Sequence, residues 1–239
     1  MFFFNLKKRL VDIGFFQGTT DWHSHILPGV DDGVSSMEHS LKTLKYYETI
    51  GISDVWLTPH IMEDIPNQTE DLRNRFEELQ AAYNGTVNLH LAAENMIDNL
   101  FYDRLANRDL LPIGPKGDHL LVETSYFQPP LNLYDTLQRI REIGYQPILA
   151  HPERYAYMDL EDYDKLKRMN IKLQLNLCSL AGGYGPEAQE KALAILAKGY
   201  YSFYGSDLHR LDAFKYAVTR KTLKKSTIKQ LAGIKNSII

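Results

Sequence analysis

From residue 19 onward the chain alternates short apolar runs with segments in which apolar residues recur every three or four positions. The short runs are rich in β-branched and aromatic residues, which predicts strands. The helical spacing between the runs predicts amphipathic helices. About seven strands are expected, at 19–22, 54–58, 87–92, 119–122, 146–150, 172–176 and 200–204. This βα order is typical of a parallel sheet covered by helices, one strand short of the usual eight-stranded barrel.

The ends of several helices are marked by capping residues. Ser35 and Glu38 have the spacing of a capping box, and Gly51 predicts the end of that helix. Thr69 predicts the start of the next helix. Later helices are expected at 133–144, at 160–169, and at 186–199, where a proline begins the segment and a glycine ends it.

Acidic residues and histidines follow these strands at their carboxyl ends or lie in the loop after the first strand. They are His23, His25, Asp32, His60, Glu94, Glu123, His151, Asp207 and His209. In a parallel barrel the carboxyl ends of the strands meet at one mouth, so we expect these side chains to converge. Imidazole and carboxylate groups bind Mn, Fe and Zn ions, and four carboxylates at one place need cations to stay ionised. The pattern therefore predicts a hydrolase with several metal ions.

Each of these residues has a simpler interpretation when it is taken alone. Glu94 or Glu123 could be a solvated loop acid, His60 a turn residue after Pro59, and Asp32 part of an Asp-Gly turn. Their common position at strand ends favours the metal interpretation. Three other histidines lie on a helix, within a strand or at a strand start and are expected to be structural or exposed: His39, His90 and His119.

Composition limits the function classes. With 239 residues, 44% hydrophobic and 24% charged, the chain is expected to fold as one large domain. A net charge of -3 gives no basic face for nucleic acid. The single Cys178 excludes an internal disulfide and suits a reducing compartment, so a cytoplasmic location is expected. Residues 1–18 are expected to form an N-terminal extension on the outside of the barrel, with weak membrane contact as the alternative.

Six short strings resemble one superfamily. They are Asp-Trp-His-Ser-His-Ile-Leu-Pro-Gly-Val-Asp-Asp-Gly (21–33), Thr-Pro-His (58–60), Ala-Glu (93–94), Val-Glu (122–123), Ala-His-Pro-Glu-Arg-Tyr (150–155) and Ser-Asp-Leu-His (206–209). In this order they resemble the PHP (polymerase and histidinol phosphatase) superfamily. Within it they are most similar to the manganese-dependent bacterial tyrosine-protein phosphatases encoded with capsule and exopolysaccharide genes. The resemblance covers residues 19–225 and implies a distorted (β/α)7 TIM-like barrel of the PHP fold, with residues 19–239 as the phosphatase domain.

The same resemblance implies three divalent ions, with manganese expected and iron, cobalt or zinc as alternatives. The implied ligand sets are His23, His25, Glu94 and Asp207 for the first ion, Glu94, Glu123 and His151 for the second, and Asp32, His60 and His209 for the third. Three divalent ions against four carboxylates leave an excess of roughly two positive charges, which suits a hydroxide and an incoming phosphate monoester.

The activity implied is hydrolysis of phosphotyrosine on the tyrosine-rich tail of a bacterial autophosphorylating tyrosine kinase. A metal-activated hydroxide would attack phosphorus. Arg154 is expected to act catalytically by binding the non-bridging oxygens, although a surface salt bridge is the simpler interpretation. Arg210 is a further candidate for substrate binding. Tyr126 and Tyr155 could stack on the substrate ring or merely pack at the barrel rim.

Two departures from the family pattern concern the substrate. The loop after His60 is acidic, at Glu63 and Asp64, where the family commonly has basic residues, and Phe214 lies where an arginine is common. A phosphatase of small phosphate monoesters such as histidinol phosphate is the nearest alternative, and the strings typical of the capsule branch argue against it. A nuclease is disfavoured because no basic track is present, and a metal-stabilised binding module would not need Arg154.

Overall fold

The computed structural model of the protein describes residues 7–220, 223–234 and 236. Residues 1–6, the first part of the expected N-terminal extension, lie outside the described residues.

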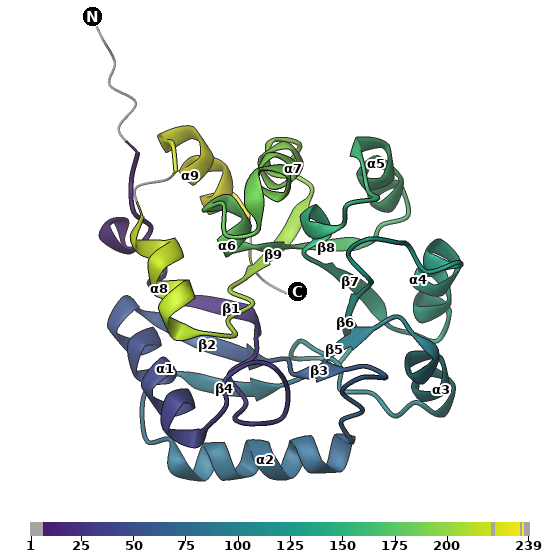
Figure 1. The fold of residues 1–239 in the computed structure, drawn as a ribbon, viewed down its shortest axis with the longest axis horizontal. Helices are drawn as coiled ribbons and strands as arrows, with labels where there is room; N and C mark the ends of the chain where they lie inside the picture. The colour runs from purple at the N-terminus through teal and green to yellow at the C-terminus, as the bar shows by residue number, and fades with distance from the viewer. Residues whose placement is uncertain (1–6, 221–222, 235, 237–239) are drawn as a thin grey trace, which may run out of the picture.

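Parallel strands form a ring at the centre of the molecule (Figure 1). The strands are β1 (Thr19–Ser24), β2 (Ile52–Leu57), β3 (His60–Ile61), β4 (Asn88–Leu91), β5 (Glu94–Met96), β6 (His119–Glu123), β7 (Gln146–Ala150), β8 (Lys172–Asn176) and β9 (Tyr201–Gly205). Thr58 and Pro59 separate β2 from β3, and two alanines separate β4 from β5. The nine segments therefore occupy seven positions, as the sequence predicted, and proline explains one break because it donates no ladder hydrogen bond.

The ring closes between its first and last strands. The amide of Asp207 donates to the His23 carbonyl at 2.7 Å, and the amide of His25 donates to the Leu208 carbonyl at 3.0 Å. This hydrogen bonding brings residues about 185 positions apart to the same edge, as in a closed barrel. The parallel α/β barrel expected from the sequence is confirmed.

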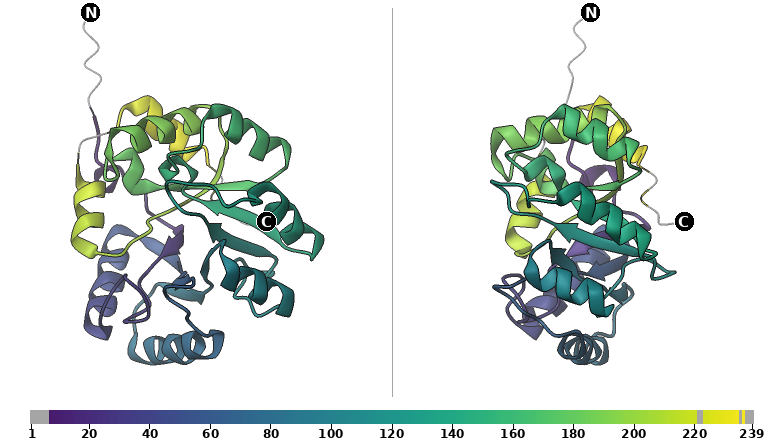
Figure 2. Two further views of the ribbon diagram at one scale, coloured as in Figure 1. Left: turned by 45° about the vertical axis from the view of Figure 1, so that its right-hand side comes forward. Right: turned by 90° about the vertical axis from the view of Figure 1, so that its right-hand side faces the viewer.

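Helices surround the ring on its outside in all three views (Figures 1 and 2). They are α1 (Met37–Ile50), α2 (Thr69–Ala82), α3 (Asn99–Asn107), α4 (Leu133–Glu142), α5 (Leu160–Arg168), α6 (Leu177–Leu180), α7 (Gly185–Ala197), α8 (Leu211–Thr219) and α9 (Lys225–Ala232). No described helix combines the length and apolar composition needed to cross a membrane.

Two predicted helix starts need correction, and four helices, α3, α6, α8 and α9, were not predicted. The N-cap of α1 is Ser36 rather than Ser35, because the Ser36 hydroxyl accepts from the amide of His39. Thr69 is the first residue of α2 and caps nothing, since its hydroxyl donates to Asp109 across the loop. The helix α3 was not predicted at all, although Asp98 caps it by accepting from the amide of Phe101.

Two apolar clusters support the fold. The larger lies between the strands and the helices. The smaller lies among inward-facing residues of the strands and includes Trp22 and Trp56, whose stacked rings have centroids 5.8 Å apart. Near the opposite end the same ring of strands carries buried histidines and carboxylates. The interior is therefore apolar at one level and polar at the mouth.

The described part of the N-terminal extension packs beside α8. Phe16 is only 2% exposed, and its ring centroid lies 6.1 Å from that of Phe214. Lys8 forms an antiparallel bridge with Leu223. Residues 7–18 therefore pack on the outside of the barrel.

Candidate metal centre

The structure brings the nine predicted ligands together at the mouth of the barrel, where His60 and Glu94 begin the short strands β3 and β5 instead of following a strand end directly. Eight of them, all except His151, supply the nitrogen and oxygen atoms of three groups, each within 4.8 Å internally, that could hold a metal ion. The groups are His23, His25, Glu94 and Asp207, then His60, Glu94 and Glu123, then His25, Asp32, His60 and His209. Because neighbouring groups share residues, they form one continuous cluster.

Glu94, the first residue of β5, lies at the centre of this cluster. Its Oε2 atom is 3.1 Å from His23 Nε2, 3.3 Å from His25 Nε2 and 3.2 Å from His60 Nδ1. Its other oxygen, Oε1, is 3.0 Å from His151 Nε2. The side chain is fully buried, so one carboxylate faces four imidazoles without solvent between them.

The groups differ in part from the ligand sets implied by the sequence. The first set is reproduced residue by residue. In the second, His60 Nδ1 lies 3.0 Å from Glu123 Oε1, whereas His151 Nε2 is 3.9 Å from Glu123 Oε2 and closer to Glu94. In the third group His25 joins the expected residues. His60 therefore faces two groups with its two ring nitrogens.

The donor atoms fit divalent cations. Several are buried yet make no hydrogen bond among the described residues, namely His60 Nδ1, Glu94 Oε2, Glu123 Oε1 and Asp207 Oδ1. Unpaired buried polar atoms are costly unless a cation or proton satisfies them. The Nε2 atoms of His23 and His25 approach each other to 3.1 Å. Imidazole nitrogens and carboxylate oxygens facing one space are the donor set of Mn, Fe and Zn sites.

Electrostatics at the cluster favour positive charge. Burial lowers the pKa of His23, but the carboxylates of Glu94 and Asp207 raise it more, to about 9. Burial raises the pKa of Glu94, yet His23 and His60 bring it well below its ordinary value. The hydrogen bond from His209 holds the pKa of Asp32 down at about 2. The carboxylates therefore stay ionised and attract protons or metal ions.

Residues that orient the imidazoles were missed by the sequence analysis. Asp31 Oδ2 lies 2.8 Å from His25 Nδ1 and accepts from the amide of His60 at 3.0 Å. Gln174 Oε1 lies 3.0 Å from His23 Nδ1 and accepts from the amide of His151 at 3.2 Å. Such partners fix the ring orientation and tautomer of a ligand histidine. Only the paired aspartates of the Asp-Asp-Gly string gave a signal for Asp31; nothing in the sequence marked Gln174.

Arg154, which follows β7, reaches over the cluster. Its Nη1 atom is 2.7 Å from Asp207 Oδ2, and its guanidinium lies between the rings of Tyr126 and Tyr184, 4.4 and 4.0 Å from their centroids. Asn176 donates to the same Asp207 oxygen at 2.7 Å. With 15% of its side chain exposed, Arg154 is not a surface salt bridge. It faces the cavity of about 360 Å³ at the mouth.

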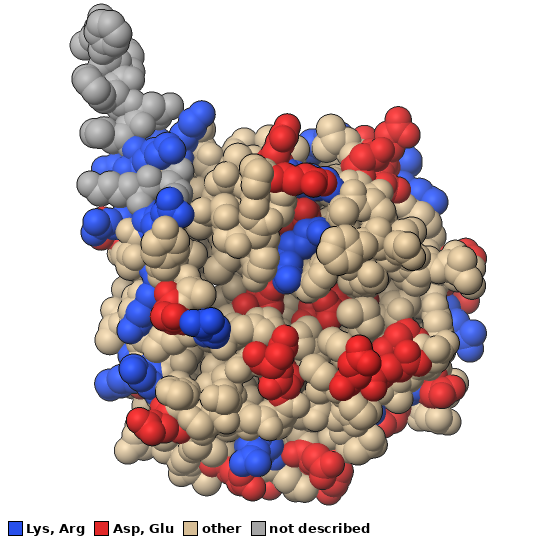
Figure 3. Space-filling model, viewed as in Figure 1, with Lys and Arg blue, Asp and Glu red and all other residues tan. Residues whose placement is uncertain are grey.

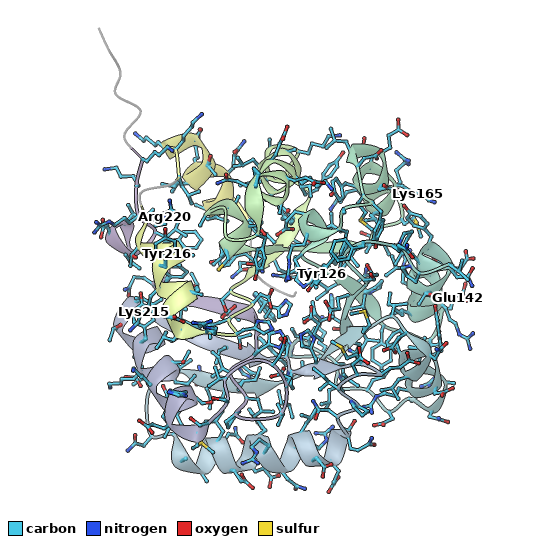
Figure 4. All side chains as sticks on the ribbon, viewed as in Figure 1. Tyr126, Glu142, Lys165, Lys215, Tyr216 and Arg220 are labelled. Atoms are coloured by element: carbon cyan, nitrogen blue, oxygen red, sulfur yellow. The ribbon has the colours of Figure 1, made fainter. Side chains whose placement is uncertain are left out.

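The other substrate-binding candidates separate in space. Tyr126 and Arg210 line the mouth cavity, and Figure 4 labels Tyr126 near the centre of the ring of strands. Tyr155 is completely buried, and its hydroxyl donates to the Ala150 carbonyl. Of the two interpretations of Tyr155, packing beneath the barrel rim is therefore right, and stacking on a substrate ring is not. Tyr184, which the sequence analysis did not select, lines the cavity instead.

Two ligand residues that follow strands have an unusual backbone conformation. His151 and Asp207 have φ angles of 30° and 50°, which non-glycine residues adopt at a cost of roughly 1–3 kcal/mol. Gly205 lies against His23, where a Cβ atom would come within 2.5 Å of His23 Cβ. Close approach of β9 to β1 is thus part of how the ligands converge.

A ring of parallel strands with imidazoles and carboxylates at its mouth is the arrangement of a TIM-type barrel that could bind metal ions. Within that class, residues 19–231 match the model of the family described as capsular polysaccharide synthesis, CpsB/CapC, and the chain belongs to this family. The resemblance drawn from the sequence strings is confirmed.

Several relatives are named as tyrosine-protein phosphatases. The chain is 26% identical over 199 residues to CapC of Staphylococcus aureus, covering 80% of this chain and 77% of the relative. It is 26% identical to the tyrosine-protein phosphatase YwqE of Bacillus subtilis over 80% of this chain and 77% of YwqE. A solved structure from the pair YwqE and Streptococcus pneumoniae CpsB, described as metal-dependent tyrosine phosphatases, superposes with a TM-score of 0.75. At 22% identity, covering 92% of this chain and 96% of that one, it establishes the shared fold.

Proposed function

We propose that this protein is a metal-dependent phosphotyrosine-protein phosphatase of capsular or exopolysaccharide synthesis. One observation carries the proposal: three overlapping groups of imidazole and carboxylate donors, two of which share Glu94, lie beneath the guanidinium of Arg154. The names of relatives such as YwqE support the reaction class. Residues 19–239 form the phosphatase domain in this proposal, and the family match over 19–231 supports that boundary.

Three divalent ions, manganese in first place, are proposed for the three donor groups. The nine ligands are those predicted from the sequence, with His60 facing Glu94 and Glu123 as well as Asp32. Asp31 adds a fifth carboxylate through its contact with His25. Three divalent ions would then leave about one excess positive charge instead of two, which increases the importance of Arg154 for holding a phosphate dianion.

Bound divalent ions supply Lewis acidity: they lower the pKa of water towards neutrality and offset phosphate charge. The residues of the chain provide position. Arg154, stacked between Tyr126 and Tyr184, can donate to two non-bridging oxygens in a fixed plane. Water supplies the oxygen of the new bond to phosphorus, the bond between phosphorus and the tyrosyl oxygen breaks, and the proton that water gives up ends on the departing phenolate. Because phenol has a pKa of about 10, the leaving group needs no dedicated acid.

The substrate proposed is phosphotyrosine in the tyrosine-rich tail of a bacterial autophosphorylating tyrosine kinase, reached in the cytoplasm. The mouth cavity is open and has a volume of about 360 Å³, which supports an aromatic phosphate as the substrate. The ring of Phe127, in the loop after β6, is exposed. The competing substrate is a small monoester such as histidinol phosphate, which the same donors could bind.

Two measurements test the function. Protein purified without chelator should contain transition metal and hydrolyse a phosphotyrosine peptide faster than histidinol phosphate, and activity lost on chelation should return with Mn²⁺ better than with Mg²⁺. Glu94→Ala should lower both metal content and kcat, because Glu94 contacts donors of two groups. His90→Ala, on β4 and paired with Asp54 away from the mouth, is the matched control. Full activity in metal-free protein would refute the proposal.

A further inference from the structure

A second cavity opens beside the candidate metal centre. It measures about 410 Å³ and lies between the loop after β1, the first turns of α1 and the beginning of α8. His209 and Arg210 line both this cavity and the mouth cavity. The two spaces are therefore neighbours, and a ligand whose phosphate lies at the metal centre can extend into the second one.

The second cavity is predominantly cationic. Lys42 of α1, Lys215 of α8 and Arg210 line it, together with a single carboxylate, Asp212, which pairs with Arg210 at 3.0 Å. Lys42 and Lys215 form no salt bridge with any described residue. The Lys215 ammonium lies 4.4 Å from the centroid of the Tyr46 ring, a contact that leaves its charge without a carboxylate partner. Figure 4 labels Lys215 on α8.

The other side of the mouth has the opposite charge. Glu63, Asp64 and Asp98 line a separate cavity between the loop after β3 and the start of α3. Figure 3 shows acidic side chains gathered over that side, whereas over α1 and α8 basic side chains lie with a few acidic ones between them. An anionic group next to a bound phosphotyrosine would be repelled on the acidic side and attracted towards the lysines.

Building on the proposed phosphotyrosine phosphatase function, we propose that the cavity between α1 and α8 is a subsite for an anionic side chain next to the phosphotyrosine of a peptide substrate. The carboxylate of Asp or Glu and the phosphate of a second phosphotyrosine share this chemistry. Val34 and Leu211 form an apolar part of the cavity wall, against which the aliphatic part of such a side chain can pack. Because Lys42 is exposed, the subsite selects among substrates rather than binding any of them tightly.

Matched phosphopeptides test the subsite. Three peptides carry one phosphotyrosine, which is flanked by Glu, Gln or Lys. A fourth peptide carries a second phosphotyrosine at the flanking position. We expect wild-type kcat/KM to be about 3- to 10-fold higher for the Glu peptide than for the Gln peptide, the scale of one or two exposed ion pairs. A still higher value for the doubly phosphorylated peptide would identify phosphate as the preferred anion. A value at or below that of the Glu peptide would identify carboxylate.

The double variant Lys42→Ala/Lys215→Ala should lose this preference through a higher KM for the anionic peptides. Lys45→Ala is the matched control, since Lys45 lies on the same helix outside the cavity and pairs with Glu48. The Glu-to-Gln ratio is taken within each variant, so that a general loss of activity cancels. Lys42→Glu/Lys215→Glu, checked for folding by thermal melting, should reverse the preference towards the Lys peptide.

The two proposals fail in different ways. If the wild-type protein hydrolyses none of the peptides and no simple aryl phosphate, the phosphatase function is wrong. If it hydrolyses all peptides equally, or if the lysine variants keep the wild-type preference, the subsite is wrong and the phosphatase function stands.

Discussion

Arg154 is held in place by its neighbours before any substrate arrives. It bonds to Asp207 and lies between two tyrosine rings, so its guanidinium has little freedom left to lose on binding phosphate. The same Asp207 is a candidate metal ligand. A single residue thus connects the ligand cluster to the group that would hold the phosphate.

Replacing Arg154 separates its expected binding of phosphate from its contact with the candidate metal ligand Asp207. Arg154→Ala should lower kcat/KM for phosphotyrosine by roughly 10²-fold, the scale of losing one charge-assisted contact to a developing oxyanion, and should leave bound metal unchanged. Arg154→Lys should recover only part, because an ammonium cannot donate in a bidentate fork. Steady-state kinetics with a phosphotyrosine peptide, together with metal analysis, give the answer. Wild-type kinetics in Arg154→Ala would remove this residue from the site.

Asp31 gives a test of a residue that acts through another. Asp31→Asn keeps an oxygen that can accept a hydrogen bond from His25 but removes the charge. Apparent metal affinity should fall by about 10- to 100-fold, as for other partners of ligand histidines. Competition with a chelator measures this affinity independently of turnover. If affinity is unchanged while kcat falls, Asp31 acts on the substrate instead.

At the scale of elements, the ligands converge because β1 and β9 approach closely. The β1–β2 register is irregular between Asp21 and Ser24, around His23. Such irregularities re-aim side chains beside functional sites. On the facing strand, Gly205 leaves room for His23, and its neighbour Ser206 bonds to the buried Asp21 through both amide and hydroxyl.

Gly205→Ala should therefore strain the closure of the barrel. The added methyl group would meet His23 Cβ and backbone, which cannot move away cheaply, so we expect a loss of about 1–3 kcal/mol in the free energy of unfolding together with lower metal content. Urea denaturation measures the first quantity. Ser202→Ala on the same strand is the control. Equal stability of the two variants would contradict the close approach.

For the whole molecule, the charge pattern of the mouth predicts how stability depends on pH without metal. The pKa of His23 is about 9 when folded and 6.5 in its unperturbed state, so its contribution is complete below pH 6.5 and lost as pH rises to about 9. The pKa of Asp32 is about 2 instead of 3.8, so its contribution is present above pH 4 and lost as pH falls towards 2.

Metal-free protein should accordingly have its highest Tm between about pH 4 and 6.5 and melt at lower temperature at pH 8.5. Mn²⁺ should raise Tm more at pH 8.5 than at pH 6, because it replaces protons on the imidazoles. Thermal melting at both pH values, with chelator or with Mn²⁺, checks this. A metal-free Tm that rises between pH 6.5 and 8.5 would contradict the prediction.

The sequence alone determined the order of the strands and the residues of the cluster. Apolar residues recur at every second position in strands and at every third or fourth position in helices, and both patterns are local. Strands such as β7 and β8 were therefore predicted with their observed bounds. The rule that parallel strands meet at their carboxyl ends then predicted that His23, Glu94 and Asp207 lie at one mouth. Local caps were less certain, since Ser35 and Ser36 are chemically equivalent candidates and only the backbone conformation selects one.

Contacts between distant segments were decided by the tertiary structure. Gln174 bonds to His23 across 151 positions, and Tyr155 turns inward although it follows Arg154 directly. The division of charge between the α1–α8 cavity and the acidic side of the mouth depends on which loops become neighbours when the barrel closes. Local spacing carries no information on such long-range pairings, because they are fixed by strand register and closure rather than by residue type.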